Sequence, residues 1–423
     1  MKNDEVIDAL RQPRRIVVAP GCGTPTTLLD LVGGRSSEIA GTALYSGLLL
    51  CDYPFLDAVE RGILTYGTWH VMPPVRNSVA DGQVQFFPVR ASQVPGLIRY
   101  LSADTAFIRV SPPDRHGFCS LGPSVSYPLV AVRNAELVIA EIDESVPRTR
   151  GEGSIHVSQI DLAIESQSLM PEYYRPYPDE ISRRIAEYIV PLLPENPTIQ
   201  IGIGSIPEAL VDRLAERGID GLRFAGMATD GMVDLHEKGL LDLQRMTPFP
   251  AIMAAELMGT RKLMDFAEEN PLLGVYSTPL GITASSLWAF DRFVSINSAV
   301  EVDRLGQVSA EWVGENQFSG IGGSVDFTEA AVHSEGGLRI IAMASTNLRD
   351  SSSKIVHSLR SGVPVTVARH SVDYVVTEYG AAHLAFATTT ERIQALASIA
   401  HPDHRDQVLG NSELVDPPTN RLL

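Results

Sequence analysis

The stretch Thr198-Ile-Gln-Ile-Gly-Ile-Gly-Ser-Ile-Pro-Glu-Ala-Leu210 decides the fold class of this 423-residue chain. A β-branched run enters a Gly-x-Gly-Ser loop, and a helix is expected from Pro207, capped by Ser205 and ended by Gly218. This order of elements favours the binding of an anion at the loop, because free backbone N–H groups and the helix dipole meet there. A tight turn that simply needs glycines gives the same pattern. The third glycine of a dinucleotide fingerprint is missing, which argues against a nicotinamide site.

Short β-branched runs alternate with helical patterns along the whole chain, which predicts an α/β fold with parallel sheets. The range 149–179 lacks strong periodicity and is expected to connect two domains. A helix is predicted from Glu180 to Pro194, with Ile181, Ile185, Tyr188 and Ile189 on one face. The sequence therefore predicts an N-terminal domain at 1–178 and a C-terminal domain at 179–423. Further strands are expected at Arg15–Pro20, Ala106–Val110 and Leu137–Glu141.

The composition narrows the classes of protein and of ligand. Acidic residues number 51 and basic residues 34, a net charge of −17, which argues against binding to nucleic acid or to an anionic membrane. No apolar run approaches the roughly 18 residues of a membrane span. Cys22, Cys51 and Cys119 form neither a disulfide framework nor a metal-ligand spacing. We expect a soluble, cytoplasmic protein without a metal.

A second glycine motif lies further along the chain. The run Phe293–Gln307 predicts a buried strand that presents Asn297, followed by a turn at Leu305-Gly306. The loop Ser319-Gly-Ile-Gly-Gly-Ser-Val-Asp-Phe327 then precedes a helical segment. Clustered glycines let the backbone approach a ligand closely or offer N–H donors to an oxyanion.

With these motifs, the chain resembles the acetyl-CoA hydrolase/transferase family, a branch of the class I CoA-transferases. The resemblance extends over nearly the whole chain and in the order of the family. The matching stretches are Val110–Gly122, Pro147–His156, Gly202–Pro207, Gly259–Leu263, Ile296–Ala299, Ser319–Gly323 with Asp326 and Phe327, Val375–Gly380 and Ile399–Pro402.

The resemblance implies two open α/β domains of the class I CoA-transferase type, with the active site between them. It implies coenzyme A or an acyl-CoA as substrate and a small molecule as acceptor. The family uses a glutamate nucleophile that attacks the thioester and carries CoA as a glutamyl thioester. The residues expected at the CoA site are Gly202, Ile203, Gly204, Ser205, Ile206, Asn297, Gly320, Gly322 and Gly323.

At the nucleophile itself the chain departs from the family. The family stretch resembles Ser-Glu-Met-x-Ser-Asp-Gly, whereas this chain reads Phe224-Ala-Gly-Met-Ala-Thr-Asp-Gly231. Met227, Asp230 and Gly231 hold the register, so Gly226 occupies the nucleophile position. Glycine has no side chain and can form neither an anhydride nor a thioester. A shifted alignment or a degenerate homologue would explain this, and so would a different chemistry on an acyl-CoA.

Glu256 is the carboxylate that could substitute, because it interrupts the apolar run Phe249–Met258 near the end of a predicted strand. Strand ends of this kind face the ligand crevice in open α/β sheets. One interpretation is an ion pair with Arg261 or another arginine. The other is a displaced nucleophile or a general base with a raised pKa.

Weaker candidates complete the set. His116 and Cys119 could form a nucleophilic pair, and Cys22 ranks below them. Arg261 and Lys262, at a predicted helix start, are the expected partners of CoA phosphates, and a role at the surface fits them equally well. Structural roles are expected for His333, His370 and Glu378.

The sequence thus predicts an enzyme that moves an acyl or CoA group between a thioester and a small acceptor, without the usual glutamyl-CoA intermediate. A thioesterase and a catalytically inactive CoA-binding subunit are the alternatives, and a homodimer is left open.

Overall fold

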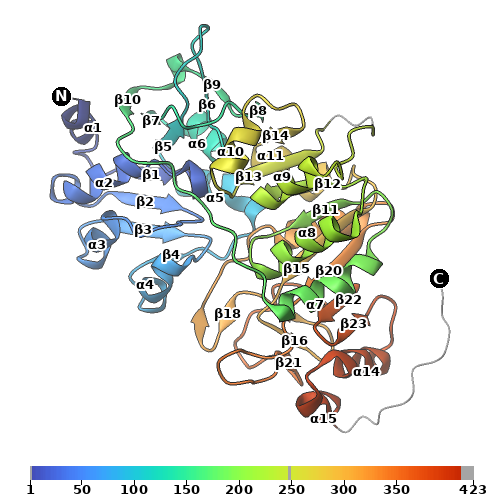
Figure 1. Cartoon of the computed structure of the whole chain (residues 1–423). Coiled ribbons are helices and arrows are strands. Elements are labelled where there is room, and N and C mark those ends of the chain that lie inside the picture. Colours follow the sequence, from blue (N-terminus) through green and yellow to red (C-terminus); the bar gives the residue numbers. More distant parts are fainter. Residues whose placement is uncertain (1, 246–248, 411–423) are drawn as a thin grey trace.

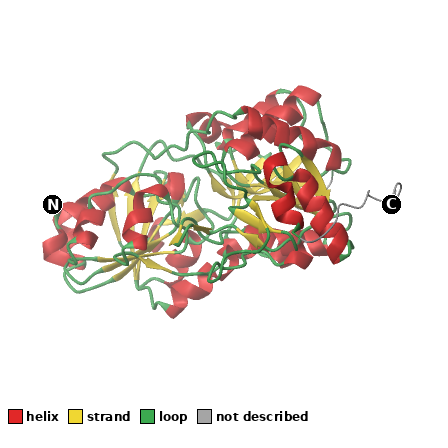
Figure 2. Cartoon of the chain, turned by 90° about the horizontal axis from the view of Figure 1, so that it is seen from below, coloured by secondary structure: helices red, strands yellow, loops and turns green. Residues whose placement is uncertain are grey.

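The computed structural model describes residues 2–245 and 249–410, and within them the chain forms two large, mainly parallel sheets covered by helices (Figures 1 and 2). The first sheet has the strand order β10-β7-β5-β1-β2-β3-β4, and all its neighbours are parallel. Its strands are β1 (Arg15–Val18), β2 (Ala43–Ser46), β3 (Thr65–Thr68), β4 (Gln85–Phe86), β5 (Thr105–Val110), β7 (Leu137–Ile142) and β10 (Leu162–Glu165).

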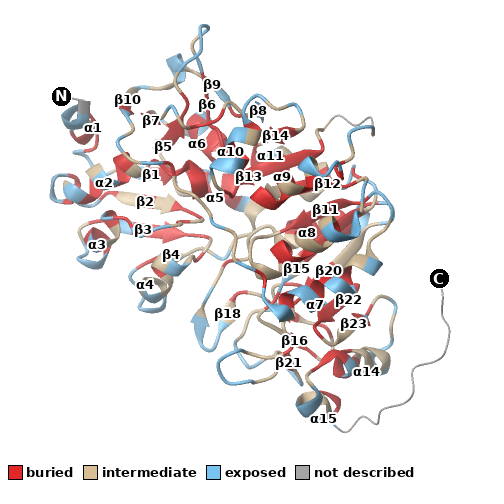
Figure 3. Ribbon diagram, viewed as in Figure 1, coloured by how far each residue is buried: buried red, intermediate tan, exposed pale blue. Residues whose placement is uncertain are grey.

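The second sheet has the order β23-β22-β20-β15-β11-β12-β13-β14-β8, and only the pair β22–β23 is antiparallel within the described residues. Figure 3 shows the strands of both sheets as mostly buried, in agreement with their apolar runs. The strands are β8 (Arg150–Gly151), β11 (Thr198–Ile201), β12 (Arg223–Ala228), β13 (Ile252–Leu257), β14 (Leu273–Val275), β15 (Phe293–Ser298), β20 (Leu338–Ala342), β22 (Tyr374–Thr377) and β23 (Gly380–His383).

Helices connect successive parallel strands, as the alternating pattern predicts. The N-terminal helices are α1 (Lys2–Ala9), α2 (Thr26–Gly34), α3 (Phe55–Glu60), α4 (Arg76–Ala80), α5 (Val94–Tyr100) and α6 (Pro128–Asn134). The later ones are α7 (Glu180–Ile189), α8 (Ser205–Arg217), α9 (Asp230–Glu237), α10 (Arg261–Ala267), α11 (Thr278–Gly281), α12 (Ala284–Leu287), α13 (Ser324–His333), α14 (Thr389–Ile399) and α15 (Arg405–Leu409). Short antiparallel or mixed pairs are β6 (Phe118–Ser120) with β9 (Ser154–His156), β16 (Glu301–Asp303) with β17 (Val308–Ser309) and β21 (Ile355–Val356), and β18 (Trp312–Val313) with β19 (Asn316–Gln317). No helix of the described residues is long and apolar enough to cross a membrane.

The α/β fold class and the three predicted strands are confirmed, whereas two helix ends differ from the prediction. Helix α7 stops at Ile189, because Pro191 lacks an N–H group and forces a 3-10 turn at Val190–Leu192. On that helix Tyr188 is 43% exposed and does not share the buried face. Helix α8 begins at Ser205 and makes no side-chain cap there, so the predicted cap is wrong; its predicted end at Gly218, in the left-handed conformation, is confirmed.

The segment predicted as a connection is only partly irregular. Its first half contains β8, β9 and β10. The chain contributes β8 to the second sheet and returns to the first sheet at β10. It then crosses to the second sheet again. Residues 166–179 have no helix or strand and form the actual link. The predicted boundary at 178/179 lies within this link, near its end, and the last residues of the predicted second domain, 411–423, lie outside the described part.

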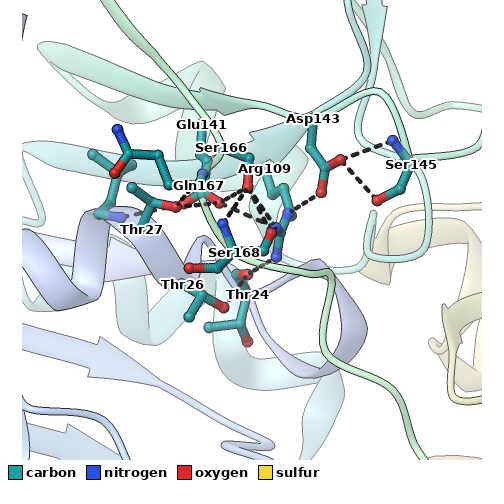
Figure 4. Close-up of polar contacts among 11 residues, drawn as sticks. Thr24, Thr26, Thr27, Arg109, Glu141, Asp143, Ser145, Ser166, Gln167 and Ser168 are labelled. Atoms are coloured by element: carbon teal, nitrogen blue, oxygen red, sulfur yellow. Dashed lines mark hydrogen bonds and ion pairs between the residues drawn. The ribbon is translucent and has the colours of Figure 1, made fainter.

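A buried polar cluster holds the start of this link against the first sheet (Figure 4). Arg109 on β5 is 1% exposed and lies 3.2 Å from a carboxylate oxygen of Glu141 on β7 and 2.8 Å from one of Asp143. Its guanidinium also donates to the Ser166 hydroxyl and to the Ser168 carbonyl, at 2.8 and 2.6 Å. Because these charges are paired and hydrogen-bonded, the cluster can be buried, and we assign it a structural role.

Candidate active site

A cavity of about 310 Å³ lies where the strand ends of the second sheet meet loops of the first half of the chain. Strands β11, β12, β13 and β15 contribute wall residues, and so does the loop before α13. This is the carboxyl edge of a parallel sheet, where ligands bind in open α/β folds. Of the predicted site residues, those that line the cavity are Gly202, Ile203, Gly226, Glu256, Asn297, Gly322 and Gly323.

Glu256 is the buried carboxylate of this cavity. It lies on β13 and is 5% exposed. The Ser126 hydroxyl donates to its Oε1, whereas its Oε2 has no hydrogen-bond partner among the described residues. Burial raises the pKa of this carboxyl to about 8, against the lowering effects of the nearby Ser126 and Ser124 hydroxyls.

The interpretation of Glu256 as an ion-paired residue is wrong. Arg261 is exposed at the start of α10, and its Nε pairs with Asp265 at 2.6 Å. No arginine or lysine of the described residues lies within ion-pair distance of Glu256. A carboxyl without a cation in a buried site favours its neutral form, which is the state expected of a proton-transfer group.

Gly226 is beside Glu256 on the neighbouring strand. Met227 and Glu256 are Cα partners, and an irregularity separates this pair from the pair Gly226–Ala254. Gly226 has a φ of +97°, and a Cβ there would lie 2.9 Å from Cζ of Phe327. Both the backbone conformation and the Phe327 ring therefore favour glycine at this position.

The predicted CoA loop divides into two parts. Gly202 and Ile203 line the cavity, whereas Gly204, Ser205 and Ile206 are not among its wall residues. Gly204 is the N-cap residue directly before α8 and has a φ of +127°, and the Ser205 hydroxyl accepts a hydrogen bond from the Ser182 hydroxyl at 3.1 Å. A Cβ at Gly202 would meet nothing within 4 Å, so packing does not require glycine there.

The second glycine loop contacts the N-terminal half of the chain. A Cβ at Gly320 would lie 2.3 Å from the carbonyl oxygen of Trp69, so glycine is required for this close approach. Gly320 itself is not a wall residue, whereas Gly322 and Gly323 are. The loop thus joins the two halves beside the cavity.

Asn297 belongs to a small polar network at the ends of β11 and β15. Its Nδ2 lies 2.8 Å from the Ser295 hydroxyl and 3.2 Å from Oε1 of Gln200. The Ser295 hydroxyl also donates to Gln200 Oε1, at 3.2 Å. These contacts fix the orientation of two amides that line the cavity, and the sequence did not single out Gln200.

The first half of the chain supplies wall residues that the sequence did not reveal. These residues are Ser126, Tyr127, Trp69 and His70. All of them lie more than 100 residues before Glu256, and no shared motif links them to it. The Tyr127 hydroxyl donates to the Val18 carbonyl at 2.9 Å, and its ring meets Trp69 edge-on at 5.0 Å between centroids. The tertiary fold alone assembles these side chains.

The predicted Cys–His pair does not form. His116 lies in an exposed turn, where its Nε2 accepts from Nε of Arg115 at 3.0 Å. Cys119 is buried in β6, and burial raises the pKa of its thiol. Cys22 is also buried, with a thiol pKa raised to about 12. Protonated, buried thiols of this kind are poor nucleophiles.

The remaining candidates lie away from the cavity wall. Lys262 pairs with Asp234 and with Glu237, which leaves it committed to neighbouring carboxylates. Glu378 accepts from the Ser345 amide and hydroxyl, at 2.9 and 2.6 Å, in agreement with a structural role. The described residues contain no group of three or more His, Cys, Asp or Glu side chains that could hold a metal ion.

Two mainly parallel sheets, with a buried carboxylate in a cavity at the strand ends of the second sheet, define an α/β protein with a candidate catalytic site. Family models for the N-terminal and C-terminal domains of acetyl-CoA hydrolase/transferase match residues 1–172 and 259–411. The chain is 34% identical, over 96% of its length and 95% of the relative, to a 4-hydroxybutyrate coenzyme A transferase of Clostridium kluyveri. The chain belongs to the acetyl-CoA hydrolase/transferase family.

Solved structures agree with this assignment. RipA from Yersinia pestis matches with a TM-score of 0.88 and 26% identity, over 96% of this chain and 95% of that one. A 4-hydroxybutyrate CoA-transferase from Porphyromonas gingivalis matches with a TM-score of 0.81 and 29% identity, over the same shares of both chains. The expected class I CoA-transferase fold is confirmed.

Proposed function

We propose that this chain acts on an acyl-CoA thioester in the cavity and moves the acyl or CoA group to a small acceptor without a glutamyl-CoA intermediate at position 226. The observation that carries the proposal is the position of Glu256. It is a buried carboxylate without an ion pair, on the strand next to Gly226 and in the same cavity wall.

The chemistry of Glu256 favours proton transfer over nucleophilic attack. With a pKa near 8, most of this carboxyl is protonated at pH 7, and a neutral carboxylic acid is a weak nucleophile. The same group can donate its proton to the sulfur as the thioester C–S bond breaks, and CoA then leaves as a thiol. Groups with pKa values near the working pH are efficient in this role.

The glycine loops support the binding half of the proposal. Gly202 and Ile203 lie at the edge of β11, directly before the N-terminus of α8, where backbone N–H groups and the helix dipole favour an oxyanion. The side-chain amides of Gln200 and Asn297 line the same cavity, and a hydrogen bond joins them. We assign the thioester end of the substrate to this region.

The test is incubation of the purified chain with acetyl-CoA alone, and with propionyl-CoA or butyryl-CoA, each with and without acetate. Free CoA is measured with a thiol reagent, and acyl-CoA species are measured by mass spectrometry. Transfer of CoA yields a new acyl-CoA only with acetate, hydrolysis yields free CoA without it, and an inactive CoA-binding subunit yields neither. The proposal fails if calorimetry detects no binding of any of them below about 1 mM, a free energy of roughly −4 kcal/mol.

The same assays on Glu256→Gln test the carboxylate. The matched control is Glu136→Gln, because the Glu136 side chain is 81% exposed and lies outside the cavity. Loss of turnover in the first variant and not in the second is the expected result.

A further inference from the structure

His70 is a titratable group of the cavity wall that the proposed function does not use. It follows β3, and among the described residues it is the histidine that lines this cavity. The Thr68 hydroxyl holds its backbone at both ends, since it accepts from the His70 amide at 3.2 Å and donates to the His70 carbonyl at 3.1 Å. The position of the residue is therefore fixed by the end of the strand.

The second glycine loop lies directly against this histidine. A Cβ at Gly320 would lie 3.1 Å from the His70 Cα, and one at Gly322 would lie 3.4 Å from Cε1 and 3.6 Å from Nδ1 of the ring. No hydrogen bond or ion pair of the ring occurs within the described part of the chain. The imidazole is thus held at the wall with no structural partner for its nitrogens.

We propose that His70 is the general base of this site, and that the acceptor is therefore a neutral molecule with an O–H bond, water or an alcohol, rather than a carboxylate. This inference rests on the proposed function, because it assigns the acceptor of the same thioester reaction. A carboxylate acceptor is already ionised and needs no base. A hydroxyl acceptor has to lose a proton as it attacks, and a neutral imidazole is the usual group that takes it.

Burial gives His70 and Glu256 the protonation states that a base and an acid need at pH 7. Burial lowers the pKa of His70 to about 4, so the ring is neutral and able to accept a proton at pH 7. Burial raises the pKa of Glu256 to about 8, so this carboxyl holds a proton to donate. Two titratable groups of one cavity whose pKa values are moved apart in this way mark the acid and the base.

The other titratable groups near His70 do not offer an alternative general base. Tyr127 lines the wall, and burial raises the pKa of its hydroxyl well above the ordinary value. Asp326 on α13 accepts from the amide and hydroxyl of Ser92 and pairs with Arg90 at 3.3 Å. Burial of the imidazole is the physical cause of the lowered pKa of His70.

The reaction is balanced with water or an alcohol as the co-substrate. A nitrogen of His70 takes the O–H proton while the oxygen attacks the thioester carbonyl carbon. The C–S bond then breaks, and Glu256 gives its proton to the leaving sulfur, which departs as CoA thiol. The proton on His70 returns to Glu256 through solvent, so both groups regain their initial states. The products are CoA and a free acid from water, or CoA and an ester from an alcohol.

The test compares His70→Gln with His116→Gln, a control on an exposed turn outside the cavity. We expect His70→Gln to lower kcat for CoA release by about 10²-fold or more with little change in KM, the usual scale for loss of a general base. In the unchanged protein, kcat/KM should rise with pH at the acidic end of the pH profile, because His70 loses its proton there. This rise should disappear in His70→Gln and remain in His116→Gln. Ethanol added to the unchanged protein should yield an ethyl ester if alcohols are accepted, and free acid alone if water is the acceptor.

Two results would overturn the inference. The first is transfer of CoA from propionyl-CoA to acetate at the same rate in His70→Gln and in the unchanged protein, since the acceptor would then be a carboxylate. The second is a titration of the His70 ring, followed by NMR of the 13C-labelled protein, that shows it protonated at pH 7; this measurement does not depend on the variant folding. If Glu256→Gln abolishes turnover while His70→Gln does not, the proposed function stands and this inference alone fails.

Discussion

Met227 and Glu256 are direct Cα partners across β12 and β13, but the preceding pair joins Gly226 to Ala254, so Ala255 is one residue extra on β13. In a regular strand, Ala255 and Glu256 would point to opposite faces. Here both line the same cavity. Bulges re-aim side chains next to active sites, and this one accounts for a carboxylate at the cavity wall beside a glycine at the expected nucleophile position.

Replacement of Glu256 by Gln should remove turnover without unfolding the protein. The amide keeps the shape and can still accept from the Ser126 hydroxyl, but it cannot give up a proton. We expect CoA release to fall by about 10²-fold or more, with a melting temperature close to that of the unchanged protein. A stable variant with full turnover would remove Glu256 from the mechanism.

The pH dependence of stability should change in the same variant. The folded protein keeps a proton on Glu256 up to about pH 8, whereas the unfolded chain releases it near 4.5, so folding stability falls as pH rises through this interval. Glutamine does not titrate, so Glu256→Gln should lose less stability between pH 5 and pH 8 in urea titrations. Parallel curves for the two proteins would show that the Glu256 carboxyl is ionised in the folded state.

Gly226→Glu should restore the family nucleophile at a cost in stability, and Gly226→Ala is its matched control. Both changes place a Cβ at a φ of +97° and against Phe327, which costs of the order of 1–3 kcal/mol. We expect similar losses of melting temperature in the two variants. Only the glutamate should allow CoA transfer to acetate and inactivation by borohydride after acyl-CoA treatment. Equal behaviour of both would mean that the acceptor side of the site has diverged as well.

Two glycine-to-alanine changes should distinguish a glycine that contacts the ligand from a glycine that packing requires. Gly202→Ala meets nothing within 4 Å, so it should fold normally and weaken CoA binding if a ligand approaches this loop. Gly320→Ala brings a Cβ to 2.3 Å from the Trp69 carbonyl, so it should lower the melting temperature itself. Calorimetry and thermal melts on both variants check this, and unchanged CoA affinity in Gly202→Ala would contradict the placement of the ligand.

Removal of the Arg109 charge should destabilise the protein strongly. Arg109→Met leaves Glu141 and Asp143 without their cation in a buried cluster, which typically costs about 3–5 kcal/mol. Arg11→Met is the control, because Arg11 pairs with Asp8 at the surface, where such pairs contribute about 0–1 kcal/mol. Urea titrations of the two variants measure the difference, and equal midpoints would contradict a structural role for the cluster.

Local features of the chain were sufficient to predict the α/β class, the strands and the end of α8. Strand β11 follows from its β-branched run, and Gly218 ends α8 because its own backbone adopts the left-handed conformation. The absence of a side chain at position 226 is likewise a property of the sequence alone. Such features depend on residues only a few positions apart, so the linear pattern contains the physical information that decides them.

The tertiary structure decided which side chains meet at the site and what their burial and pKa values are. The apolar run around Glu256 predicts burial, but only the fold shows that its partner is Ser126 rather than Arg261, and that His70 lies at the same cavity wall. These side chains come from separate strands and loops, more than 100 residues apart in the case of Ser126 and Glu256. Charge, burial and pKa at such a site depend on contacts across the fold, and the periodicity of any one segment does not encode them.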